Sequence, residues 1–183
     1  GGTTSSNTDG NITATVQANP TAGFSIVTYT GNGVQTGKTV GHGLGAVPKM
    51  IISKDRGATS NVATWRTYHE AIGNTKYLQL PHTDAASVFN DWDNTTPTSS
   101  VYSVGGLGGY TPTNTNNTEY IAYVFADVQG YSKFGSYKGN SHSGGDGTFV
   151  YTGFAPAWVL IKRTDVANDW IIHDYKLGTK ASS

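Results

Sequence analysis

Two places in the sequence set a histidine directly before an acid, a pairing that general acid–base catalysis uses. They are His69–Glu70 and His173–Asp174. Neighbouring residues of a β-strand point to opposite faces, so the two members of each pair would diverge. Both pairs also occupy equivalent places in an internal repeat, which favours a shared structural role. We therefore expect no catalytic residues and a protein that is not an enzyme.

The segment NDWDNTTPTSS (90–100) places two carboxylates, Asp91 and Asp93, on either side of Trp92. Paired carboxylates carry out glycoside hydrolysis, and carboxylate oxygens are ligands of Ca²⁺. The polar composition of the segment instead predicts a solvated loop. The spaced ligand series of a calcium motif does not occur in the sequence, and SGGDG (143–147) is no better a candidate. We expect no metal site and no cofactor.

Trp92 and Tyr110 lie in stretches rich in Gly, Thr and Asn, and they are the candidate carbohydrate-binding residues. An exposed ring on such a loop can stack on the apolar face of a sugar. The alternative is a loop that packs over its own aromatic anchor. The other tryptophans, Trp65, Trp158 and Trp170, belong to repeated strands, and we expect them to be core or half-buried packing residues.

The composition favours an all-β fold. Of the 183 residues, 36% are hydrophobic and 13% are charged, whereas typical soluble domains have about 45–50% and about 25%. Thr, Ser, Asn and Gly make up the difference, and these residues suit strands and turns better than helices. We predict antiparallel β-sandwich modules, jelly-roll-like and arranged in tandem, with little or no helix.

Charge and hydropathy exclude several classes of partner. The net charge is zero, so the chain has no electrostatic footprint for nucleic acid or an anionic membrane. Apolar runs fall short of the roughly 18 residues of a membrane span, and we expect no membrane insertion. The absence of cysteine excludes disulfides, thiolate catalysis and zinc held by sulfur. The sequence starts without a signal peptide or an initiator methionine, from which we expect a fragment or a processed product.

Alternation predicts a first strand at FSIVTY (24–29), with Ser25, Val27 and Tyr29 on one face. The residues Gly-Asn-Gly at 31–33 would end this strand, because they tolerate positive φ. The runs PKMIISK (48–54) and PAWVLIK (156–162) are apolar at most positions, which is typical of strands covered on both faces. Further strands are predicted at 76–80, 99–104 and 119–128.

The chain contains an internal duplication. FSIVTYTGNG (24–33) recurs as YSKFGSYKGN (131–140). In both copies a proline then opens an apolar run that ends in lysine, and a tryptophan and a His–acid pair follow. An ordered series of this kind is typical of a repeat. We predict an extended segment or linker at 1–22, a first β-module at 23–129, and a second, incomplete copy at 130–183.

The second copy has no counterpart of the strand at 119–128. A sandwich that lacks a central strand exposes apolar surface and an unpaired edge. We therefore expect the second module to be completed by residues beyond this chain or by another subunit, or to be only partly formed.

The series GFSIVTYTGNG, VGHGLGAVPKMIISK, YIAYVFADVQGYSKFGSYKGN and FVYTGFAPAWVLIKRTD resembles a repeated module of large virion proteins of marine tailed phages, including cyanophages. The resemblance covers about residues 23–173. It implies a non-enzymatic structural protein of the extracellular phage particle, as a tail fibre or a capsid or tail appendage. The implied partners are other virion proteins and copies of the chain in a homo-oligomer, with host cell-surface polysaccharide as an additional partner. The family brings no catalytic residues to this sequence.

Two other functions stay open. The first is a polysaccharide-degrading, depolymerase-like phage appendage enzyme, which two carboxylates about 5–10 Å apart in one cleft would favour. The second is a free carbohydrate-binding, lectin-like module, which a coherent cleft of loop-borne aromatic rings would favour.

Overall fold

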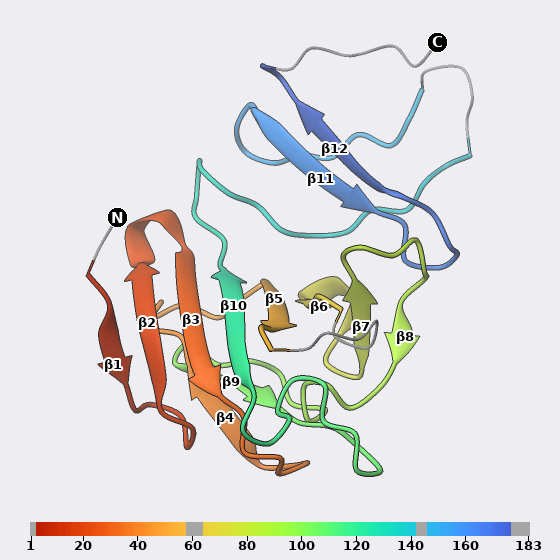
Figure 1. Ribbon diagram of the computed structural model, residues 1–183. Coiled ribbons are helices and arrows are strands. Elements are labelled where there is room, and N and C mark those ends of the chain that lie inside the picture. The colour runs from red at the N-terminus through yellow and green to blue at the C-terminus, as the bar shows by residue number, and fades with distance from the viewer. Residues whose placement is uncertain (1–2, 58–63, 142–145, 177–183) are drawn as a thin grey trace.

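The computed structural model describes residues 3–57, 64–141 and 146–176 (Figure 1). The strands are β1 (Ser5–Asn7), β2 (Ala14–Asn19), β3 (Phe24–Thr30), β4 (Lys38–Gly41), β5 (Met50–Asp55), β6 (Arg66–His69), β7 (Lys76–Gln79), β8 (Ser87–Val88), β9 (Val101–Val104), β10 (Glu119–Phe125), β11 (Trp158–Lys162) and β12 (Trp170–Asp174). Two single 3-10 turns occur, at Pro20–Ala22 and Glu70–Ile72. Within the described ranges no helix has the length and apolar character to cross a bilayer. The all-β antiparallel fold is confirmed.

Eight strands form one antiparallel sheet in the order β1-β2-β3-β10-β5-β6-β7-β8. Strand β10 enters the sheet between β3 and β5, which come much earlier in the chain (Figure 1). Two smaller antiparallel sheets consist of β4 with β9 and of β11 with β12. The strands predicted at 24–29, 48–54, 76–80, 99–104 and 119–128 are confirmed as β3, β5, β7, β9 and β10.

One face of the large sheet carries the hydrophobic core. Alternation directs Val27 of β3, Ala122 of β10 and Ile51 of β5 to this face, and all three are fully buried. The small sheet β4–β9 supplies Val40 and Tyr102 to the same cluster. The molecule is therefore a sandwich with unequal sheets, in which loops complete the smaller layer.

Of the extended segment or linker predicted at 1–22, strands β1 (Ser5–Asn7) and β2 (Ala14–Asn19) are extended and belong to the large sheet, so they are not a linker. Strand β2 pairs with β3 along its whole length, and β1 pairs with β2. Val16 of β2 points into the core and is 4% exposed. Asn11 also joins this segment to the opposite sheet, because its Oδ1 accepts a hydrogen bond from Thr39 N at 2.8 Å. The N-terminal strands are a structural part of the first module.

The turn after β3 is held by a buried asparagine. Asn32 N donates to Asn114 Oδ1 at 3.0 Å, and Asn114 Nδ2 donates back to Asn32 Oδ1 at 2.8 Å. Gly33 has φ 72°, as expected for a residue that ends the strand. Gly31 serves a different purpose, since a Cβ there would overlap the backbone oxygen of Thr115. The turn is thus fixed by close backbone approach and by paired amides.

The hairpin β11–β12 repeats β5–β6. In the first module Lys54 lies over the ring of Trp65, with Nζ 5.5 Å from the ring centroid. In the second copy the corresponding lysine, Lys162, is the cross-strand partner of Trp170. The two copies of the duplication therefore share a lysine that lies beside the tryptophan of its own hairpin.

The rest of the second copy departs from expectation. Residues 131–140 do not form the predicted first strand, and the backbone pairing there is a single isolated bridge at Ser132. Trp158 is 53% exposed, so the prediction of a packing position is wrong for it, and β11 is not covered on both faces. Trp65 and Trp170 are half-buried, as predicted. Without a neighbouring β10-type strand in the described chain, the segment at 131–140 has no edge on which to pair.

Replacing Gly31 by alanine should lower the free energy of unfolding by about 1–3 kcal/mol, the usual effect of overpacking. The added methyl would overlap the Thr115 carbonyl and separate the turn from Asn114. Gly135→Ala is the matched control, because its Cβ would meet no atom within 4 Å. Urea unfolding measures both variants, and equal stabilities would show that the close approach is not required.

Candidate functional site

Trp92 lies inside the sandwich. It is 1% exposed, and its ring packs edge-on against Tyr68 of β6, with centroids 5.8 Å apart and planes at 70°. The neighbouring Asp91 is 0% exposed. The prediction that the segment 90–100 is a solvated loop is therefore wrong for these two residues. A buried ring presents no face to a sugar, so Trp92 is not a carbohydrate-binding residue. It is instead the aromatic anchor over which its own loop packs.

Tyr110 follows a tight turn built from the glycine-rich segment 105–109. Leu107 N donates to Tyr110 O at 2.9 Å, and Tyr110 N donates to Leu107 O at 3.1 Å. Both glycines between them have positive φ, as a two-residue hairpin turn requires. Tyr110 is 37% exposed, and its ring centroid lies 5.6 Å from that of Phe89. The turn thus presents one face of Tyr110 at the surface.

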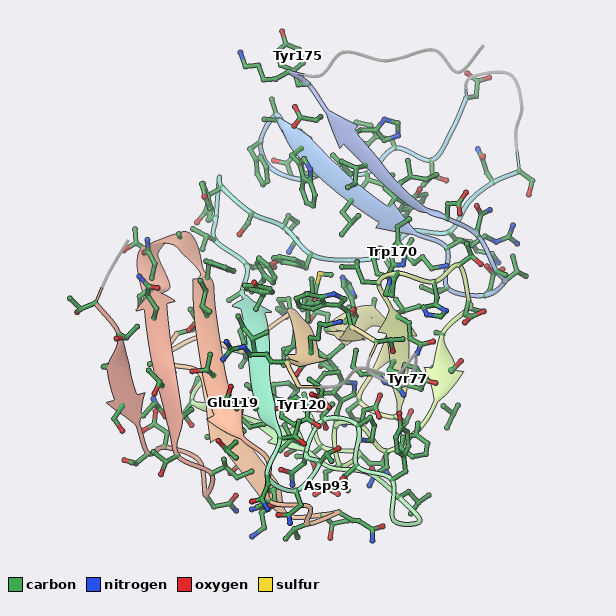
Figure 2. All side chains as sticks on the ribbon, viewed as in Figure 1. Tyr77, Asp93, Glu119, Tyr120, Trp170 and Tyr175 are labelled. Atoms are coloured by element: carbon green, nitrogen blue, oxygen red, sulfur yellow. The ribbon has the colours of Figure 1, made fainter. Side chains whose placement is uncertain are left out.

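Arg66 of β6 joins the surroundings of Trp92 and Tyr110. Its Nη1 lies 3.5 Å from Asp91 Oδ2, and its Nη2 donates a hydrogen bond to Tyr110 Oη at 3.0 Å. The guanidinium also stacks on Tyr77 of β7, with Cζ 4.1 Å from the ring centroid; Figure 2 labels Tyr77. The two residues that the sequence singled out are therefore linked through one buried ion pair, which sequence reasoning did not predict.

Burial governs the electrostatics of this pair. It raises the pKa of Asp91 to about 6, although the Arg66 guanidinium acts in the opposite direction. For Arg66, burial alone would lower the pKa, but the Asp91 carboxylate and the hydrogen bonds to tyrosines raise it overall. Both carboxylate oxygens of Asp91, and Nε and Nη1 of Arg66, make no hydrogen bond to the described chain. Such incompletely satisfied ions cost folding free energy.

Asp91 and Asp93 do not form the acid pair that glycoside hydrolysis needs. Asp93, labelled in Figure 2, accepts a hydrogen bond through Oδ2 from Gly37 N at 2.6 Å. Asp91, in contrast, is buried and pairs with Arg66. A glycosidase requires two carboxyl groups that flank one substrate bond. The cluster around Arg66 therefore anchors two loops to β6.

The histidine–acid pairs have separate surroundings. His69 Nδ1 accepts a hydrogen bond from Ala71 N at 3.1 Å and caps the 3-10 turn that follows β6. Burial lowers the pKa of His69, which suits a neutral ring that accepts at Nδ1. Glu70 forms an ion pair with Lys49. His173 is exposed on β12, in the other hairpin.

One surface hollow does bring two carboxylates together, Asp55 at the end of β5 and Glu119 at the start of β10. Glu119 Oε2 lies 3.2 Å from Arg56 Nη1, and Asp55 Oδ1 accepts a hydrogen bond from Gly57 N at 2.8 Å. Across the described ranges no group of three or more His, Cys, Asp or Glu residues could hold a metal ion. Most of the SGGDG motif lies outside the described residues.

The face of the large sheet opposite the core carries an aromatic row, formed by Phe24, Tyr123 and Trp65. The rings of Phe24 and Tyr123 are 13° from parallel with centroids 6.3 Å apart, and Tyr123 lies 5.8 Å from Trp65 at 20°. All three residues are half-buried. The alternation of each strand sends these rings away from the core. The row exists only because β10 pairs with β3 on one side, and on the other β5 alone separates it from the start of β6.

Residues 1–182 match the family described as "Domain of unknown function (DUF7483)". The chain belongs to this family. In this DUF7483 chain the match spans both the large sheet and the β11–β12 hairpin. Comparison with curated proteins and with solved structures gave no match.

The free energy of unfolding of this DUF7483 chain should gain a contribution from Asp91 as the pH falls. The folded pKa is about 6 and the unfolded value is 3.8, so the folded state binds the proton more tightly in that window. Lowering the pH from 7.5 to 5 should add about 1 kcal/mol through this group. Asp91→Asn removes the contribution. Above about pH 6, where the Asp91 carboxylate is charged, the substitution also lowers stability by leaving Arg66 without its charge partner.

The comparison between wild type and Asp91→Asn isolates this effect. Burial lowers the pKa of His42 and His69, and stability from these residues is lost as the pH falls through that range. Both proteins share that opposing trend, so it cancels in the difference. Urea unfolding of both proteins at pH 5 and pH 7.5 measures the Asp91 contribution. If the free energy of unfolding changed equally with pH in the two proteins, a raised pKa for Asp91 would be contradicted.

Proposed function

We propose that this chain is a non-enzymatic structural module of a phage virion, in a tail fibre or in a capsid or tail appendage, where it assembles with copies of itself and other virion proteins. The β11–β12 hairpin is the observation that carries this proposal, because it repeats β5–β6 without the flanking strands. Arrays of stacked modules bury such surfaces against their neighbours. The resemblance to virion proteins of marine tailed phages supports the same function.

Contact with host-surface glycans is a second proposed activity, and the aromatic row favours it. Its three rings lie half-buried on the face of the large sheet opposite the core, with Lys54 over Trp65 at one end. Aromatic faces of this kind can stack on the apolar faces of sugar rings. Trp92 has no part in this proposal because it is buried, whereas Tyr110 stays a candidate because of its exposed face.

The depolymerase alternative would use Asp55 and Glu119, the carboxylates that share a hollow. An acid catalyst must deliver a proton to the leaving group, but Glu119 forms an ion pair with Arg56, with Oε2 3.2 Å from Nη1. This pairing opposes a role for Glu119 as a proton donor. A non-enzymatic function therefore has the better support.

Mass spectrometry of purified virions from the phage that encodes this chain should detect its peptides at abundances comparable to other structural proteins. A density map of the same particles should show the unequal sandwich as repeated density in a fibre or appendage. Detection of the chain in infected cells but not in purified virions would overturn the proposed location.

Trp65→Ala should weaken binding of the purified protein to host polysaccharide about 2- to 10-fold, which corresponds to loss of one ring contact of about 0.5–1.5 kcal/mol. Trp158→Ala is the matched control, because it removes an exposed tryptophan outside the aromatic row. Isothermal titration with polysaccharide extracted from the host measures both. Equal losses in the two variants would contradict the aromatic row as a glycan site and leave the structural function in place.

A further inference from the structure

Strand β11 has one free edge within the described part of the chain. Its counterpart β5 is paired on both sides, with β6 and with β10. Strand β11 pairs with β12 alone, and Figure 1 shows the two strands as a separate ribbon. Trp170 of β12 contacts the large sheet, because its Nε1 donates a hydrogen bond to Gln79 O of β7 at 3.2 Å. An unpaired edge of this kind is a template for another strand.

The correspondence between β5 and β11 has a defined register. Pro48 and Pro156 open the two runs, and Lys54 and Lys162 close them. The two runs have equal length, so a single numbering offset relates both pairs. Each lysine also lies beside the tryptophan of its own hairpin. Residues of β5 can therefore be mapped one by one onto β11.

The hairpin exposes apolar side chains on both of its faces. Ile171 and Ile172 are consecutive in β12 and are 45% and 58% exposed, and Trp158 of β11 is 53% exposed. By contrast Met50, which the offset pairs with Trp158, is 7% exposed in the first module. Tyr175 follows β12 and points away from the large sheet (Figure 2). Exposed apolar surface of this kind marks an interaction site.

We propose that the free edge of β11 binds an extended strand with the β10 pattern, Tyr-Ile-Ala-Tyr-Val-Phe, carried by a second polypeptide. The duplication identifies this occupant, because a strand of that pattern covers the same edge of β5. Backbone hydrogen bonds supply the affinity in such strand addition, and alternating side chains supply the specificity. The inference rests on the modular assembly proposed above, but its test needs neither a virion nor a host.

The pairing of β10 with β5 gives the register of the complex. Tyr123 lies opposite Ile52. The offset that relates Lys54 to Lys162 maps Ile52 onto Leu160, so the same tyrosine of the donor should lie opposite Leu160. In the first module this tyrosine stacks on Trp65. The donor tyrosine should therefore lie against Trp170, the tryptophan of the second hairpin.

Disulfide mapping can test the register without background, because the chain has no cysteine. The donor is a synthetic peptide of residues 117–128 carrying Tyr123→Cys, with lysines added at its ends for solubility and oxidised glutathione as the two-electron acceptor. The Leu160→Cys chain should form a mixed disulfide with it several-fold faster than Ile161→Cys, whose side chain lies on the other face. Ile52→Cys is the matched control, because its edge is already occupied by β10.

The unmodified peptide should also slow deuterium exchange of β11 amides in the wild-type chain, which requires no variant to fold. Equal crosslinking of all three variants, together with unchanged exchange, would overturn the proposal. Peptide-independent disulfide dimers of Leu160→Cys would overturn it too, since they would assign the edge to β11 of a second copy. Site-specific capture of the peptide by a chain that is missing from virions would instead refute the virion location alone.

Discussion

Strand β10 forms hydrogen-bonded ladders with β3 on one side and with β5 on the other, and these ladders join segments that are far apart in the sequence. Closing the intervening loops costs chain entropy, which packing has to offset. Tyr29 and Tyr120 contribute to that packing, since their rings stack 5.1 Å apart at 9° and both are buried. Tyr29 Oη also donates to Thr113 O at 2.7 Å, which places the loop that carries Asn114. The sheet, the loop and the turn after β3 therefore depend on one central strand.

The second copy shows what a similar sequence pattern does without that strand. Val40 of β4 is fully buried, whereas Val150, placed by the offset that relates Gly43 to Gly153, is 47% exposed. The hairpin still forms, because β11 and β12 are neighbours in sequence and their contacts are local. The sandwich does not follow, because it needs strands from further along the sequence. Comparison of the two copies thus shows that the local sequence pattern specifies the hairpin, whereas the sandwich requires long-range strand pairing.

The same distinction explains which features could be predicted from the sequence. Strands β3, β5, β7, β9 and β10 each carry their own apolar or alternating pattern, and all were predicted. Strand β2 was missed because its core residues, Ala14 and Val16, are small and lie among polar residues. Trp92 and Asp91 lie in a polar stretch, and their burial results from packing against Arg66 and its neighbours on a different strand. The residue pattern within 90–100 does not indicate that Trp92 and Asp91 are buried.

The buried pair of Arg66 and Asp91 is better understood as fixing an arrangement than as adding stability. Buried ion pairs with unsatisfied hydrogen-bonding atoms can often be replaced by apolar residues at no loss of stability. The pair nevertheless determines where its neighbours lie, with Trp92 inside the sandwich and Tyr110 at the surface. The core is thereby closed on one face of the large sheet, while the aromatic row stays on the other and the edge of β11 stays open. Contacts with a glycan and with a second module would use different surfaces, so one chain could make both at once.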